Sequence, residues 1–173
     1  MKKISKGYAE FQICPEIIKP VFISQEYIPV RLEWKRKAER VKYLGFYDGT
    51  KSLLEIVVGE ESKKIHRIVL VSCYNYFISE SARIIDNACV LNDMELTIIT
   101  DKEREAISCN LDIVLYEEAV HINLFKENEI FQYVKNGRVQ FGLDRFGDLK
   151  KIVITDLKNK EKEHILQELE MQH

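Results

Sequence analysis

The sequence contains few glycines and prolines and has no long hydrophobic run. Seven glycines and three prolines are spread over 173 residues, of which 46% are hydrophobic and 31% charged. This balance is that of an ordinary globular protein and excludes a fibrous or disordered chain. No apolar run approaches the roughly 18 residues that cross a bilayer, since the longest, residues 68–73, has the length of one strand. No apolar stretch follows the first lysines, so we expect no signal peptide, a cytoplasmic protein without a membrane partner, and a single domain over residues 1–173.

Motifs of known chemistry are also missing. The four cysteines include no C-x-x-C pair, so the sequence signals neither a disulfide framework nor a zinc site. The patterns H-E-x-x-H, G-x-S-x-G, the P-loop and G-x-G-x-x-G do not occur. We therefore predict no cofactor, no metal site, no catalytic residue and no enzymatic activity. The alternative is a small enzyme whose active site follows no motif, in which His66 or His121 would meet a carboxylate or a cysteine in a deep pocket.

One pattern, however, occurs in both halves of the chain. An apolar stretch over residues 53–59, a charged turn and a second stretch over 67–71 are matched by residues 139–144, another turn and residues 151–155. Each pair has the alternation of a β-hairpin. The match aligns the glycines at the end of the first stretch in each copy.

The repeated hairpins predict the fold class. We expect an α+β protein that is mainly an antiparallel β-meander, with a C-terminal helix. Two meander-plus-helix pseudo-repeats, over residues 28–90 and 94–171, would pack as one domain. Asp48-Gly49 and Asn136-Gly137 are the strongest turn signals, because these residue types tolerate positive φ and are typical of two-residue hairpin loops.

The spacing of apolar residues places three further elements. A helical period predicts helices over residues 79–89 and 158–171, and Asp156 is the expected cap of the second. Strict alternation over residues 107–115 predicts one long strand. Residues 126–135 have no regular period and are expected to form a connection.

One surface segment is strongly basic. Residues 35–42 follow Trp34 and are predicted to form the tip between two strands; their basic side chains are Lys35, Arg36, Lys37, Arg40 and Lys42. Such a tip can bind a phosphate backbone or an acidic protein surface, and it can equally be a solubilising turn. A nucleic-acid accessory protein is therefore a second alternative function. No RNP-like aromatic pair, helix-turn-helix or zinc pattern accompanies the tip, so nucleic acid is not the partner we expect.

The general character of the chain resembles a family of bacterial inhibitors. Its small size, its lack of a secretion signal, its composition rich in Lys, Glu and Ile, and hairpins such as residues 136–144 are similar to the single-domain immunity proteins encoded beside polymorphic or contact-dependent toxins. The resemblance covers the whole chain but no specific motif. It implies tight one-to-one binding that occludes a cognate toxin domain in the cytoplasm. Many inhibitors of nucleases are strongly acidic, whereas the net charge here is −2, so the kind of toxin is left open.

We therefore predict a cytoplasmic protein-binding module, with toxin neutralisation as its sharpest form. The second half of the chain is the acidic half: residues 81–173 carry 12 basic and 18 acidic side chains, against 14 and 10 in residues 1–80. Interfaces depend on a few aromatic or arginine anchors. On these grounds the predicted partner-binding residues are Trp34, Arg36, Asp112, Tyr116, Glu117, Glu118 and Phe125.

Overall fold

The described residues form strands and one helix, which confirms the predicted α+β class. The structure, a computed structural model, describes residues 9–49, 51–81, 87–127 and 129–173. The elements of the described residues are β1 (Glu10–Pro15), β2 (Val21–Phe22), β3 (Val30–Glu33), β4 (Val41–Tyr47), β5 (Leu53–Gly59), β6 (Ile65–Ser72), β7 (Tyr76–Ile78), β8 (Cys89–Leu91), β9 (Met94–Ile99), β10 (Arg104–Ser108), β11 (Asp112–Leu115), β12 (Val120–Asn123), β13 (Gln132–Asn136), β14 (Val139–Leu143), β15 (Leu149–Ile154) and α1 (Asn159–Met171).

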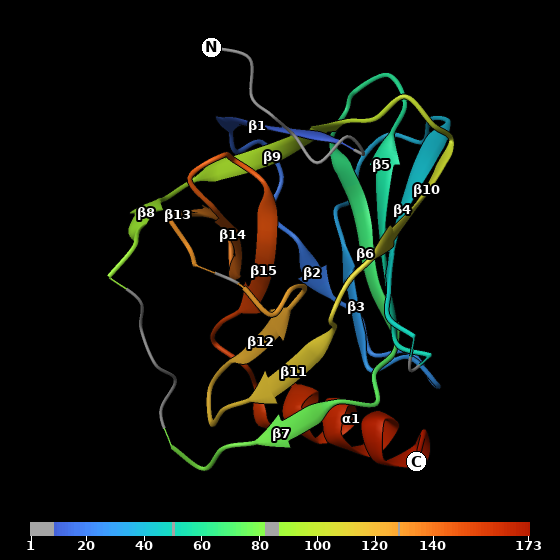
Figure 1. Cartoon of the computed structure of the whole chain (residues 1–173), viewed down its shortest axis with the longest axis vertical. Coiled ribbons are helices and arrows are strands. Elements are labelled where there is room, and N and C mark those ends of the chain that lie inside the picture. Colours follow the sequence, from blue (N-terminus) through green and yellow to red (C-terminus); the bar gives the residue numbers. More distant parts are fainter. Residues whose placement is uncertain (1–8, 50, 82–86, 128) are drawn as a thin grey trace.

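Two large sheets face each other across the core (Figure 1). The six-stranded sheet has the order β10-β4-β5-β6-β3-β2, and the seven-stranded sheet has the order β7-β11-β12-β15-β14-β13-β8. A ribbon of β1 and β9 crosses one end of the pair of sheets, and α1 crosses the other end. Most neighbouring strands are antiparallel, whereas β10, β7 and β8 run parallel to their neighbours β4, β11 and β13.

The two hairpins predicted from the turn signals Asp48-Gly49 and Asn136-Gly137 both form. β4 and β5 are joined after Asp48, whose N–H donates to the carbonyl of Ser52 at 3.1 Å. β13 and β14 are joined by Gly137, which has a φ of +60°, the left-handed conformation that favours glycine. The meander is interrupted in both sheets, because β3 pairs with β6 and not with β4, and β12 pairs with β15 and not with β13.

The two large sheets share one strand order. The spatial order β2-β3-β6-β5-β4 in the six-stranded sheet corresponds to β11-β12-β15-β14-β13 in the seven-stranded sheet. Beyond β4 and β13, each order ends on a parallel outer strand, β10 in the first sheet and β8 in the second. The pairing of β3 with β6 places residues 30–33 against residues 70–67, as β12 with β15 places residues 120–123 against 154–151. The sequence match between residues 67–70 and 151–154 is therefore also a match of register.

This equivalence corrects one detail of the predicted alignment. Arg67 pairs with Val57, and its counterpart Lys151 pairs with Gly142. The counterpart of Gly142 is thus Val57 and not Gly59. A register shift follows each of the two equivalent residues, between Val57 and Val58 and between Gly142 and Leu143. The pseudo-repeats stay a prediction. The two parallel outer strands also do not follow the predicted division of the chain into residues 28–90 and 94–171. β8 pairs within the sheet of the second half, and β10 pairs within the sheet of the first half.

The long strand predicted over residues 107–115 is wrong. The segment forms β10 in the six-stranded sheet and β11 in the seven-stranded sheet. The chain crosses between the sheets at Cys109, whose N–H donates to the Tyr47 carbonyl, and at Asn110, whose N–H donates to the Leu124 carbonyl. A period of two indicates that alternate side chains are buried, but it does not say that they are buried in one sheet.

The two helix predictions have different outcomes. The helix predicted over residues 79–89 falls partly on residues 82–86, outside the described residues; its described flanks are not helical, since the Ser79 N–H donates to the Leu115 carbonyl and Cys89 begins β8. The C-terminal helix is confirmed as α1, but Asp156 does not cap it. Asp156 lies before the helix at a φ of +53°, and the first turn is held by Glu161, which accepts the Lys158 N–H at 3.0 Å.

One continuous apolar cluster draws on both large sheets, the ribbon and α1. Trp34 lies between the sheets, is 3% exposed and stacks on Phe141 at 6.4 Å between ring centroids. Its Nε1–H donates to the side-chain oxygen of Asn136 at 2.5 Å, and the Asn136 side-chain nitrogen donates to the Ile18 carbonyl. This chain of contacts joins the first sheet, the second sheet and the segment before β2.

A buried ion-pair cluster attaches the ribbon to the six-stranded sheet. Glu95 of β9 is 1% exposed and is paired with Arg36 and Lys64, and it accepts the Ile17 N–H at 2.8 Å. Burial alone would raise the pKa of Glu95, but the hydrogen bonds from Arg36 and Ile17 and the charges of Arg36 and Lys64 outweigh it, so the pKa is lowered. Arg36 also donates from Nε to the Ile65 carbonyl.

We expect the stability of the protein to fall at acid pH. Burial would raise the pKa of Glu39, Glu95 and Glu161, but hydrogen bonds and neighbouring cations outweigh it, so each is lowered from 4.5. These carboxylates therefore stabilise the fold fully above pH 4.5, and this stabilisation is lost as the pH falls through their folded-state pKa values. Urea unfolding between pH 3 and 7 should show a shallower acid loss in Glu161→Gln than in the exposed control Glu170→Gln. Equal slopes in the two variants would contradict this prediction.

Candidate functional site

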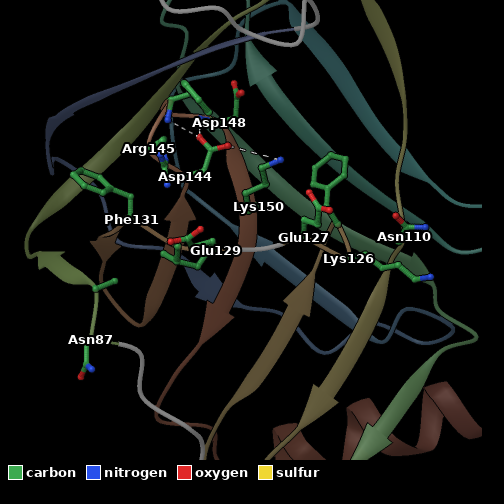
Figure 2. Close-up of a pocket in the computed structure, with 14 residues that line it drawn as sticks. Asn87, Asn110, Lys126, Glu127, Glu129, Phe131, Asp144, Arg145, Asp148 and Lys150 are labelled. Carbon is green, nitrogen blue, oxygen red and sulfur yellow. Dashed lines mark hydrogen bonds and ion pairs between the residues drawn. The ribbon is translucent and has the colours of Figure 1, made fainter.

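A concavity lies at one end of the strands of the seven-stranded sheet. Its volume is about 1430 Å³, and it opens between the β12–β13 connection, the β14–β15 turn and the segments that precede β8 and β11 (Figure 2). We call it the concave site; its lining residues are Asn87, Ala88, Asn110, Phe125, Lys126, Glu127, Glu129, Ile130, Phe131, Asp144, Arg145, Phe146, Asp148 and Lys150.

Asp144 fixes the turn that forms one wall of the site. Its Oδ1 accepts the backbone N–H of Phe146 at 2.9 Å and of Asp148 at 3.0 Å. The turn is closed by the Gly147 N–H, which donates to the Asp144 carbonyl, and Gly147 has a φ of +82°. An aspartate that binds the amides of its own turn and a glycine at positive φ are a typical combination for a rigid tight turn. These bonds therefore fix the backbone from which the Arg145 and Phe146 side chains project.

The base of the site is a mostly buried charged cluster of Lys150, Asp144 and Asp148. The Lys150 ammonium lies 3.8 Å from the Asp144 Oδ2 and 4.5 Å from the centre of the Phe125 ring. Figure 2 shows Asp144 and Lys150 pointing toward each other. The Lys150 side chain is 8% exposed, so this charge is shielded from water and matched by the carboxylate and the aromatic face.

The rim of the site combines exposed rings with unpaired charges of both signs. Phe131 is 63% exposed and Phe146 is 56% exposed, although residues of this size are usually covered. Arg145 is exposed and forms no ion pair with another described residue. The same holds for the remaining charged rim residues, which are Lys126, Glu127 and Glu129. Two cations therefore face two anions around the aromatic rings.

The structure brings only part of the predicted partner-binding set to this site. Phe125 lines it, and Asp112 lies at the same end of the β11–β12 hairpin, where its Oδ1 accepts the Asn123 side-chain N–H at 2.7 Å. Tyr116, Glu117 and Glu118 lie at the opposite end of that hairpin, in its turn. The two glutamates are exposed in the turn, as their sequence position suggests.

Trp34 and Arg36 are not available as contact residues, which corrects their assignment. Trp34 is a core residue, and the Arg36 side chain is 8% exposed and paired with Glu95. Residues 34–40 do not form a hairpin tip either, because β3 and β4 are not neighbours and the segment crosses the end of the sheet between them. A basic segment can be predicted from sequence, but the distant carboxylate that buries one of its charges cannot.

No histidine or cysteine is among the residues that line the concave site. His66 Nε2 lies 3.6 Å from Glu39 Oε2, but Oε1 of that carboxylate accepts the Glu61 and Ser62 N–H groups, so Glu39 holds a turn. His121 is 4% exposed, and its ring packs on Tyr116. Burial raises the pKa of the Cys73 thiol to about 12, which opposes thiolate chemistry. In the described part of the chain, no group of three or more His, Cys, Asp or Glu side chains is placed to hold a metal ion.

The sequence reasoning missed the residues that form the rim. Phe131 lies in the segment read as an irregular connection, although residues 132–136 form β13. Phe146 and Arg145 lie in the segment Asp144-Arg-Phe-Gly-Asp148, which was read only as a turn. A large aromatic residue placed in a tight turn, where no core can cover it, was the available signal.

Comparison with known proteins adds no family. Neither a protein-family model nor any curated protein sequence matches the chain. Within the described residues, no helix has the length and apolar character to span a membrane.

Proposed function

We propose that the chain is a protein-binding module and that the concave site is its contact surface. The observation that carries the proposal is that Arg145 and the exposed rings of Phe131 and Phe146 line one concavity. Asp144 makes rigid the turn that carries Arg145 and Phe146. Aromatic and arginine side chains dominate the energy of protein interfaces, and residues already held in place lose little entropy on binding.

The balance of charge on the rim favours a protein over a nucleic acid. A phosphate backbone is bound by a surplus of cations, whereas the exposed charges here are Lys126 and Arg145 against Glu127 and Glu129. Protein surfaces present both signs and apolar groups within one patch. The basic segment offers less to a nucleic acid than its sequence suggested, since the Arg36 charge is buried against Glu95.

In its most specific version, the proposal is that the protein is an immunity protein. In this form the chain binds a cognate bacterial toxin domain in the cytoplasm and blocks it by occlusion, without catalysing a reaction. The support is the resemblance in size and general character, together with a contact surface that is preformed and open. Inhibition by occlusion needs a rigid surface of this kind and no cofactor.

A capture experiment with matched variants tests the proposal. The double variant Phe131→Ala/Phe146→Ala removes both exposed rings of the concave site, and Phe77→Ala removes a ring that is 60% exposed on β7, away from it. We expect wild type and Phe77→Ala to retain the same protein from an extract of the native host, and the double variant to lose it. Equal urea midpoints would show that all three fold alike. Equal retention by the double variant would refute the proposed contact surface.

A further inference from the structure

The seven-stranded sheet has one strand that has no counterpart in the other large sheet. β7 pairs in parallel with the outer edge of β11, and the register places Tyr76 against Ile113 and Ile78 against Leu115. The counterpart of β11 in the six-stranded sheet is β2. Among the described residues, no strand pairs with the outer edge of β2.

The registers identify the residue of β2 that corresponds to Ile113. Phe22 pairs with Leu32, which pairs in turn with Ile68 of β6. Ile113 pairs with Ile122, which pairs in turn with Ile152 of β15. Ile68 and Ile152 are at the same position of the two matched stretches, so Phe22 and Ile113 are equivalent across three strands of each sheet.

The backbone of Phe22 points away from its sheet, as the backbone of Ile113 does. In an antiparallel pair, alternate residues turn their N–H and C=O groups outward. The Ile23 N–H donates inward to the Arg31 carbonyl at 2.9 Å, so its neighbour Phe22 is an outward residue. The outward N–H of Ile113 donates to the Asn75 carbonyl beside β7 at 2.9 Å. The equivalent N–H of Phe22 has no such acceptor among the described residues.

The side chains of residues 21–23 carry no charge along this edge; Lys19 and Pro20 precede them, and the Phe22 ring contacts His164 of α1. Residues 21–23 are Val-Phe-Ile, and Val21 is 42% exposed. Natural sheets commonly guard an edge with charged residues, above all lysine. The opposite edge of the same sheet follows that rule, because β10 begins with Arg104 and Glu105.

We propose that the outer edge of β2, at residues 21–23, binds an extended segment of a protein partner as an additional parallel strand. The chain itself shows what such a strand looks like: β7 adds to β11 with the uncharged sequence Tyr-Phe-Ile. The occupant is therefore an extended, uncharged segment rich in aromatic and aliphatic residues. It is not the β7 of a second copy, since β7 is already paired within its own chain. Strand addition of this kind takes its affinity from main-chain hydrogen bonds.

The probe for this edge is a capped peptide with the uncharged sequence of residues 74–79, titrated into the isotope-labelled full chain and followed by NMR. We expect saturable shifts centred on residues 21–24, and exchange of the Phe22 amide hydrogen slowed about tenfold at saturation. The same peptide with proline in place of its phenylalanine should give neither effect, because proline lacks an N–H. Val21→Lys should remove the response without a change in urea midpoint, whereas Val90→Lys, on the β8 edge where Val90 is 40% exposed, should keep it.

Three results would overturn the proposal. The first is the absence of shifts at residues 21–24, and the second is an equal response to the proline peptide. The third is line broadening at residues 21–24 that grows with protein concentration in the absence of peptide, since this would assign the edge to a second copy. None of these results bears on the concave site, which is tested separately by the variants of Phe131 and Phe146.

Discussion

Replacing Glu95 with alanine is expected to lower the free energy of unfolding by about 3–5 kcal/mol, the usual cost of removing one partner from a buried ion pair. The variant leaves Arg36 and Lys64, whose side chains are 8% and 18% exposed, without their carboxylate. It also leaves the Ile17 N–H without its acceptor. The loss should be measured as a shift in urea midpoint at pH 7 and low salt.

Two further variants show whether this loss comes from the unpaired charge. Arg36→Met/Glu95→Leu removes two of the three charges and leaves only the more exposed Lys64 unpaired. It should recover a large part of the stability, because apolar residues of similar volume often replace a buried pair without loss. Glu33→Ala breaks a pair in which the Arg31 and Glu33 side chains are 24% and 31% exposed, and it should cost less than about 1 kcal/mol. A cost for Glu95→Ala as small as that for Glu33→Ala would contradict the assigned role of Glu95.

Replacing Trp34 with alanine is expected to cost about 3–5 kcal/mol, because it removes a large side chain from a packed core. The ring is 3% exposed and stacks on Phe141 of the opposite sheet. Trp34→Phe keeps an aromatic ring but leaves the Asn136 side-chain oxygen without its donor, and it should cost about 1–3 kcal/mol.

The same residue offers a direct optical check. Trp34 is the only tryptophan of the chain, so its fluorescence reports this site alone. We expect emission typical of a buried indole, weak quenching by iodide, and no change when a partner is bound. Strong quenching in the free protein that is relieved by a partner would instead restore Trp34 as a contact residue.

Local signals predicted the fold class and the hairpins, because each depends on residues close together in the sequence. Gly137 needs only its own positive φ and the alternation on either side to join β13 and β14. The division of residues 107–115 between two sheets depends instead on Tyr47 and Leu124, the distant acceptors of two consecutive amides. Alternation of apolar residues carries no information about those partners.

The candidate site was harder to predict, because four separate parts of the chain form it. Phe125 was selected as an exposed aromatic residue near acidic side chains, and it lies in the concave site. Arg36 was selected because it lies in a basic segment, but Glu95 pairs with it in the interior. Phe131 and Arg145 become neighbours only when the β12–β13 connection and the β14–β15 turn lie side by side (Figure 2).

The matched strand order of the two large sheets connects the fold to both proposals. Two equivalent hairpins, β5–β6 in the first sheet and β14–β15 in the second, have their turns at residues 59–64 and 144–148. The first turn is held by Glu39 from another segment, whereas the second is held by its own Asp144. The second turn can therefore display Arg145 and Phe146 without help from a neighbouring segment. Two similar frameworks thus differ in the features that a partner would contact.

Hydrogen exchange of the purified complex tests the proposed contact surface most directly. The partner retained by the wild-type chain would be added in excess, and exchange would be compared with that of the free chain. We predict that protection concentrates on residues 125–127, 129–131 and 144–148, and that it is absent for a complex formed with Phe131→Ala/Phe146→Ala. Protection confined to residues 116–118 or to residues 35–42, with the concave site unchanged, would contradict the account.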